Sequence, residues 1–216
     1  MKVAAVIPAH NEERRIVRVI ETLKSAKGID EIIVVSDGST DKTYETAAGI
    51  DGIKAVKLAR NLGKGGAMSA GAKHTNAEIL LFMDADLIGL TPSHAEDLLR
   101  PILEEQADMS IGVFRGGRMR TDWAQMLTPF ISGQRAIRKE LFLSVPNAEQ
   151  TRYGIEIAIS RHVRSSGLNT VLVPLAGVTH PMKEEKLGYL MGTISRAKMY
   201  WEIVKMVMLT SVRRTG

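Results

Sequence analysis

The stretch that decides the fold is EILLFMDADL, residues 78–87. Its apolar run has the length and composition of a strand covered on both faces, as in parallel sheets flanked by helices. The run leads directly into Asp84 and Asp86. On an extended chain, residues i and i+2 face the same side, so both carboxylates can address one ligand, and a divalent cation would relieve their repulsion. Alternatively, Asp86 caps a helix near 91–106 and Asp84 is a solvated strand end.

Strand and helix signals alternate on both sides of this stretch. Such alternation predicts an α/β fold with a parallel sheet in an open layer architecture. Strands are expected at 2–7, 31–36, 53–59, 78–84, 108–114 and 169–175, and helices at 12–25, 42–48, 64–75 and 91–106. A short strand and helix within 131–142, a helix from 152 closed by Gly167 and a long C-terminal helix from 184 to 212 complete the chain.

The composition limits the classes of function. The 216-residue chain has no cysteine, which excludes disulfides, zinc–thiolate sites and cysteine nucleophiles. Of the net charge of +5, the segment from Lys183 onward supplies seven basic against three acidic residues, so the charge is too localised for a typical nucleic-acid binder. The N-terminus lacks a signal-peptide pattern and no apolar run could span a bilayer, so we expect a cytoplasmic protein, with peripheral contact at the inner membrane face as an alternative.

Polar clusters follow the predicted strands at 8–12, 36–41, 60–66 and 84–87, where open α/β sheets bind ligands. The glycine-rich loop before the helix at 64–75 suits phosphate oxygens at a helix N-terminus, with Lys64 as counter-charge. It also partly matches a dinucleotide fingerprint through Gly63 and Gly65, which leaves an NAD(P)-dependent oxidoreductase as an alternative. Asp37 can accept a hydrogen bond from an imide or a ribose hydroxyl, or simply form a turn.

Two side chains of the second half also suggest chemistry. Glu156 lies among apolar residues of a predicted helix, where a carboxylate is either used or paired with Arg135 or Arg138. His180 follows the last predicted strand and could be a metal ligand, a phosphate partner or a turn residue.

Four motifs, VIPAHNEE (6–13), VVSDGSTDKT (34–43), NLGKGGAM (61–68) and FMDADL (82–87), together resemble the nucleotide-diphosphosugar glycosyltransferases of the GT-A fold, family 2 type. ISGQRAIRKELF and RYGIEIAI extend the likeness to dolichyl-phosphate-mannose-synthase-like and glucosyl-3-phosphoglycerate-synthase-like enzymes. The resemblance implies a Rossmann-like, mostly parallel sheet flanked by helices. It places a catalytic domain at 1–182, with a nucleotide-sugar half at 1–90 and an acceptor half at 91–182. A basic amphipathic helix at 183–216 follows as an extension.

The resemblance also implies roles for individual residues. The nucleotide-sugar site would comprise Pro8, Ala9, Asn11, Glu12, Asp37, Lys64, Gly65, Asp84, Ala85 and Asp86. Asp84, Asp86 and His180 would hold Mg²⁺ or Mn²⁺, with Asp86 the more direct ligand. Lys64, Asp86 and Glu156 would be catalytic, Glu156 either as general base or as a group that orients the acceptor. The acceptor, a polyprenyl phosphate or a small phosphorylated metabolite, would meet the basic residues Arg115, Arg118, Arg120, Arg135 and Arg138, and Tyr153.

The implied activity is transfer of a hexose from a UDP- or GDP-sugar. A non-catalytic nucleotide-sugar-binding subunit is a further alternative. The predicted C-terminal helix carries a narrow apolar stripe flanked by basic residues, which fits packing on the catalytic domain, a homodimer seam or contact with an anionic membrane. The stripe comprises Leu190, Ile194, Ala197, Trp201, Val204 and Met208.

Overall fold

The structure is a computed structural model that describes residues 1–115, 132–152 and 154–181. The chain divides into two compact units, Met1–Thr179 and His180–Gly216. The predicted C-terminal helix lies outside the described residues. Among those that are described, no helix combines the length and apolarity that crossing a lipid bilayer requires.

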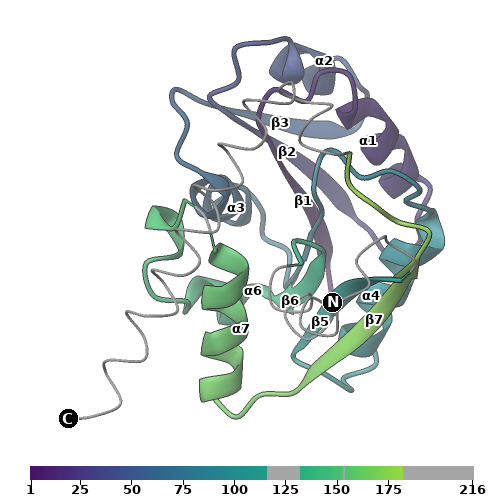
Figure 1. Ribbon diagram of the computed structural model, residues 1–216, viewed down its shortest axis with the longest axis vertical. Coiled ribbons are helices and arrows are strands. Elements are labelled where there is room, and N and C mark those ends of the chain that lie inside the picture. The colour runs from purple at the N-terminus through teal and green to yellow at the C-terminus, as the bar shows by residue number, and fades with distance from the viewer. Residues whose placement is uncertain (116–131, 153, 182–216) are drawn as a thin grey trace. The chain divides into compact units, whose positions relative to one another are not determined.

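The first unit is built on one seven-stranded sheet in the order β3-β2-β1-β4-β6-β5-β7 (Figure 1). Only β6 runs against its neighbours β4 and β5, and the other pairs are parallel. The predicted parallel α/β sheet is therefore confirmed, with one antiparallel insertion. The strands are β1 (Val3–Ala9), β2 (Glu31–Asp37), β3 (Ile53–Leu58), β4 (Ile79–Phe82), β5 (Met109–Arg115), β6 (Arg135–Arg138) and β7 (Thr170–Ala176).

Helices cover both faces of the sheet because successive strand residues point to opposite sides. One face carries α1 (Ile16–Lys24), α2 (Thr43–Ala48) and α4 (Pro92–Leu103), which share a core with Ile79 and Leu81 of β4. The other carries α3 (Lys64–Lys73), α6 (Lys139–Leu143) and α7 (Ile155–Ser165), which share a core with Leu80 and Phe82 (Figure 1). A short 3-10 turn, η1 (Ala148–Gln150), precedes α7. The continuous apolar run of β4 thus follows from burial on both faces.

The strand order reverses between β1 and β4, where β1 pairs with β2 on one side and with β4 on the other. The paired register of β1 and β4 runs from Val3↔Ile79 to Val6↔Phe82. Beyond it, β1 continues to Ala9 while the chain of β4 turns away with Asp84. Ligands of open α/β sheets bind at such a switch point, so the paired carboxylates stand where the topology places a site.

Helix α1 begins four residues later than the predicted start at residue 12. Asn11 has a positive φ of 57°, and the backbone N–H of Glu12 donates to the Thr43 hydroxyl at 2.8 Å. These contacts hold residues 11–15 as a turn and connect the end of β1 to the first residue of α2.

Candidate active site

Lys64 is the centre of the candidate site. It is the first residue of α3, and its ammonium lies 2.5 Å from Asp84 Oδ1 and 2.7 Å from Glu156 Oε1. Glu156 stands in the first turn of α7, 92 positions further along the chain. Burial opposes the charge of the ammonium, but the carboxylates of Asp84 and Glu156 outweigh it and raise the pKa of Lys64 above its ordinary value. Lys64 is therefore held as a cation.

This pairing corrects the predicted partners of Glu156. Arg135 is fully buried and donates to the backbone oxygen of Glu156 at 3.1 Å. Burial lowers the pKa of Arg135 to about 10, against the opposing charges of Glu156 and Asp84. The described contacts of this buried guanidinium are to the protein itself, and an acceptor role for Arg135 stays a prediction. Its observed role is to tie the chain before β6 to α7.

Arg138 is also predicted to contact the acceptor, but it lies away from Lys64 and its partners. It pairs with Ile79 at the amino end of β4, whereas Arg135 pairs with Phe82 at the carboxyl end. Its guanidinium lies 3.8 Å from Met1 Sδ. The side chains of Arg115, Arg118, Arg120 and Tyr153 lie outside the described part of the structure, so their predicted acceptor role stays a prediction.

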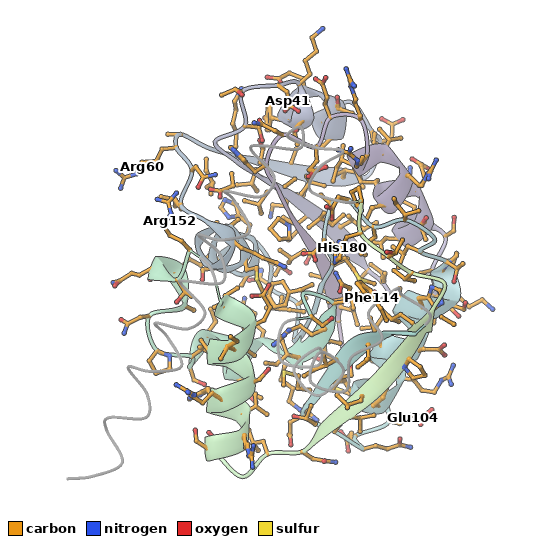
Figure 2. All side chains as sticks on the ribbon, in the orientation of Figure 1. Asp41, Arg60, Glu104, Phe114, Arg152 and His180 are labelled. Carbon is orange, nitrogen blue, oxygen red and sulfur yellow. The ribbon has the colours of Figure 1, made fainter. Side chains whose placement is uncertain are left out.

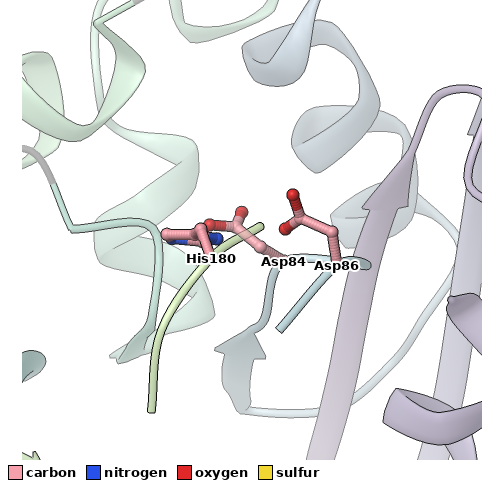
Figure 3. A group of neighbouring side chains, drawn as sticks. All are labelled: Asp84, Asp86 and His180. Atoms are coloured by element: carbon pink, nitrogen blue, oxygen red, sulfur yellow. The ribbon is translucent and has the colours of Figure 1, made fainter. Parts of the chain in front are cut away.

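Asp84, Asp86 and His180 offer ligand atoms that all lie within 4.8 Å of one another, and their side chains gather in Figure 3. Two carboxylates and an imidazole suit a divalent ion that prefers oxygen and nitrogen ligands. Around Mg²⁺, opposite ligand atoms are about 4.2 Å apart, so these three groups fit with a small adjustment.

The glycine-rich loop differs from its prediction. Leu62 and Gly63 donate their backbone N–H groups to the two carboxylate oxygens of Asp37, at 2.7 and 2.9 Å. Lys64 and Gly65 donate theirs to backbone oxygens of the loop before α7, at 3.2 and 3.1 Å. All four amides thus have protein acceptors, so the predicted phosphate contact of the Gly65 amide is wrong. The dinucleotide interpretation of this loop fails for the same reason.

Close packing explains the glycines of this loop. Gly63 has a φ of 85°, and a Cβ there would clash with the backbone of Arg152. Arg152, which is labelled in Figure 2, also donates to the Asn61 side chain at 3.0 Å. The glycines therefore let the loop before α7 dock on α3, which carries Glu156 toward Lys64.

The residues predicted for the nucleoside pocket lie at the carboxyl ends of β1 and β2. Pro8 and Ala9 end β1, and Asn11 follows, its Oδ1 accepting the Thr40 N–H at 2.9 Å. Glu12 is buried and lies 3.4 Å from Arg15. Ala85 is buried between the two aspartates. These positions put the predicted set along one edge, while contact with a nucleoside stays a prediction.

Sequence reasoning missed Gln134, whose side-chain amide donates to Asp84 Oδ2 at 2.7 Å. It lies within the motif ISGQRAIRKELF, directly before the predicted short strand. An amide side chain at that position was the available signal, but its burial is visible only in the structure.

Known proteins resemble this chain over most of its length. Glucosyl-3-phosphoglycerate synthase of Mycolicibacterium smegmatis is 32% identical over 192 residues, which cover 73% of this chain and 62% of that protein. Dolichyl-phosphate beta-glucosyltransferase of Drosophila melanogaster is 30% identical over 139 residues, which cover 56% of this chain and 43% of that protein. The chain spans less than two thirds of the length of these curated relatives.

Among solved structures, glucosyl-3-phosphoglycerate synthase of Mycobacterium tuberculosis with Mn²⁺, uridine diphosphate and glucosyl-3-phosphoglycerate superposes with a TM-score of 0.71 at 28% identity. The superposition covers 83% of this chain and 72% of that one. A structure of the same synthase holds Mg²⁺ and uridine diphosphate, with a TM-score of 0.70 at 27% identity. The predicted GT-A fold is thereby confirmed. The family model for glycosyl transferase family 2 matches residues 4–164, and the chain belongs to that family.

Proposed function

We propose that this chain is a metal-dependent glycosyltransferase that moves a hexose from a UDP- or GDP-sugar to a phosphate-bearing acceptor. The observation that carries the proposal is the bridge of Lys64 between Asp84 and Glu156, with Asp86 beside it at the switch point. It joins the end of β4, predicted to face the donor, to the helix predicted to face the acceptor. The family membership and the relatives named above support the same class of reaction.

On the donor side, Asp86, Asp84 and His180 would hold the Mg²⁺ or Mn²⁺ that the synthase structures contain. When bound, that ion supplies positive charge next to the departing nucleoside diphosphate. Lys64 reaches the same place from α3 with a side chain about a quarter exposed. Its ammonium is fixed before the reaction and can donate to the oxygen that gains negative charge, which is how preorganised cations lower a barrier.

On the acceptor side, Glu156 projects from the first turn of α7 with one carboxylate oxygen on Lys64. It either takes the proton of the acceptor hydroxyl or orients that hydroxyl toward the sugar carbon. The two roles predict different products, because a base-assisted direct displacement inverts the anomeric configuration. Proton NMR of the anomeric configuration of the product distinguishes them.

The function is tested by thermal shift against UDP, GDP and their sugar nucleotides, with and without Mn²⁺. NADH is included to test the oxidoreductase alternative. We expect one nucleoside diphosphate to raise the melting temperature, and to raise it further when Mn²⁺ is present. Radiolabelled transfer is then measured with 3-phosphoglycerate and with a short polyprenyl phosphate, the acceptor classes named for the relatives. Binding without transfer to either acceptor would favour the non-catalytic subunit, and no metal-dependent nucleotide binding would reject the proposal.

Of the two predicted acceptors, we favour the small phosphorylated metabolite over the polyprenyl phosphate. The relatives that align over most of this chain are phosphoglycerate synthases, whereas the Drosophila polyprenyl-phosphate relative aligns over a smaller share. In a competition assay with both acceptors at equal concentration, we expect 3-phosphoglycerate to receive most of the label.

A further inference from the structure

The segment 132–135, which ends in the first residue of β6, contacts Asp84 through Gln134 and the backbone of Glu156 through Arg135. We call it the brace. Gln134 is fully buried, and its amide nitrogen donates to Asp84 Oδ2 at 2.7 Å. Since Asp84 Oδ1 meets Lys64 at 2.5 Å, the carboxylate is held at both oxygens. A hydrogen bond at each oxygen fixes the plane of a carboxylate, which a single contact does not.

Gln134 is itself held in one orientation. Its backbone oxygen accepts the Gly112 N–H at 2.8 Å, which attaches the brace to β5. Its side-chain oxygen lies 3.0 Å from the Ser132 hydroxyl, which also lies 2.5 Å from the Gly112 oxygen. Because an ionised carboxylate only accepts hydrogen bonds, the amide must turn its NH₂ group toward Asp84.

The other two residues of the brace fit the same geometry. A Cβ on Gly133 would collide with Lys64 Nζ and with both carboxylate oxygens of Asp84, so the backbone passes directly against the ion pair. Arg135 faces the opposite side and donates to the backbone oxygens of Ser132 and Glu156, at 2.5 and 3.1 Å. The brace therefore connects the carboxylate after β4 with the first turn of α7.

We propose that Gln134 is a positioning residue of the transfer reaction and acts through Asp84. This inference rests on the proposed function. By holding Oδ2, Gln134 stops the Asp84 carboxylate from rotating fully onto Lys64, and it keeps Asp84 turned toward Asp86. Partners behind a metal ligand commonly change metal affinity or activity roughly 10- to 100-fold when they are removed.

The test is Mn²⁺ affinity measured in the presence of saturating UDP, from the electron paramagnetic resonance signal of free Mn²⁺. Gln134→Met keeps the length of the side chain and removes its donor. We expect affinity to weaken roughly tenfold or more, while UDP affinity without metal stays within twofold of the wild type. A purely structural role would lower both. Equal Mn²⁺ affinity in Gln134→Met and wild type would overturn the inference.

Gln106→Met is the matched control, because Gln106 is exposed and donates to the Glu104 carboxylate at 2.8 Å away from the brace. It should leave Mn²⁺ affinity unchanged. Two further variants report on the same geometry. Ser132→Ala removes only the hydroxyl that fixes the amide, and it should weaken Mn²⁺ binding less than Gln134→Met does.

Gly133→Ala disturbs the ion pair most directly, because the nearest atoms to its methyl group would be the side-chain ends of Lys64 and Asp84 rather than backbone atoms. We expect a folded protein, by near-ultraviolet circular dichroism, with weakened Mn²⁺ binding. Unchanged binding in both Ser132→Ala and Gly133→Ala would contradict the brace. A wild type that binds no Mn²⁺ with either UDP or GDP would instead reject the proposed function, so the two failures are distinguishable.

Discussion

The loop that opens α3 and the strand end after β4 lie at the same edge of the sheet, and both are rich in groups that suit a ligand. In the loop, the amides of residues 62–65 all donate to acceptors of the chain itself. After β4, Asp84, Asp86 and His180 bring together three groups that could hold a metal ion. The amides of the first region donate within the chain, whereas the second region gathers side chains that suit a cation.

The difference shows that polarity at the functional edge does not identify a binding site by itself. A motif predicts which groups are available, but only the fold decides which of them already have partners within the chain. Asp37 illustrates this, because a residue expected to meet a nucleoside uses both oxygens to hold the loop before α3. Substitutions in the two regions should therefore affect different measurements.

The largest effect is expected at the strand end. Asp86→Ala should lower the transfer rate roughly a hundredfold or more, since removing a group that stabilises the transition-state charge costs about 3 kcal/mol. The free energy of unfolding should stay within about 0.5 kcal/mol of the wild type. Steady-state kinetics and urea denaturation measure the two quantities. Asp51→Ala, at an exposed turn before β3, is the control. A rate that remains metal-dependent and unchanged would remove Asp86 from the site.

The opposite pattern is expected in the loop. Asp37→Asn places an NH₂ group against a backbone N–H, because one of the two acceptor oxygens facing Leu62 and Gly63 is lost. We expect the free energy of unfolding to fall by about 2 kcal/mol, the cost of a buried donor left without its acceptor. Urea denaturation measures the loss. Wild-type stability combined with loss of UDP binding would show that Asp37 serves the nucleoside instead.

The smallest effect concerns Asp41, which holds the turn before α2. Partial burial disfavours its charge, but hydrogen bonds from the Thr43 hydroxyl and from the amides of Thr43 and Glu13 lower the pKa of Asp41 below its ordinary value. Asp41→Ala should cost about 1 kcal/mol at neutral pH. A lowered pKa in the folded state means that this contribution exists above the ordinary pKa and disappears as pH falls below it.

The stability difference between Asp41→Ala and wild type should therefore shrink below about pH 4. Thermal denaturation across pH 3 to 7 measures it. A difference that stays constant with pH would show that the charge of Asp41 is not what stabilises the turn.

The sheet and the carboxylates after β4 could be predicted because both depend on local patterns, namely a doubly buried apolar run and two acids at its end. Lys64 and Glu156 were both singled out from the sequence, but the ion pair between them was not predicted. Which of several charged residues meet is decided by how α3 and α7 dock, and no local pattern encodes that docking. Arg135 and Arg138 are three residues apart on β6, yet they pair with opposite ends of β4.

Pro8 has a consequence for how the edge of the sheet can change shape. Val6 accepts the Met83 N–H at 3.2 Å, so Pro8, two residues further along β1, presents its backbone to the same side. Proline has no N–H, and β1 therefore offers no donor with which the chain after Met83 could continue the parallel ladder. The covalent structure of Pro8 thus limits how far β1 and the segment after β4 can pair. The end of this pairing is therefore set by the chemistry of one residue and does not depend on whether a ligand is bound.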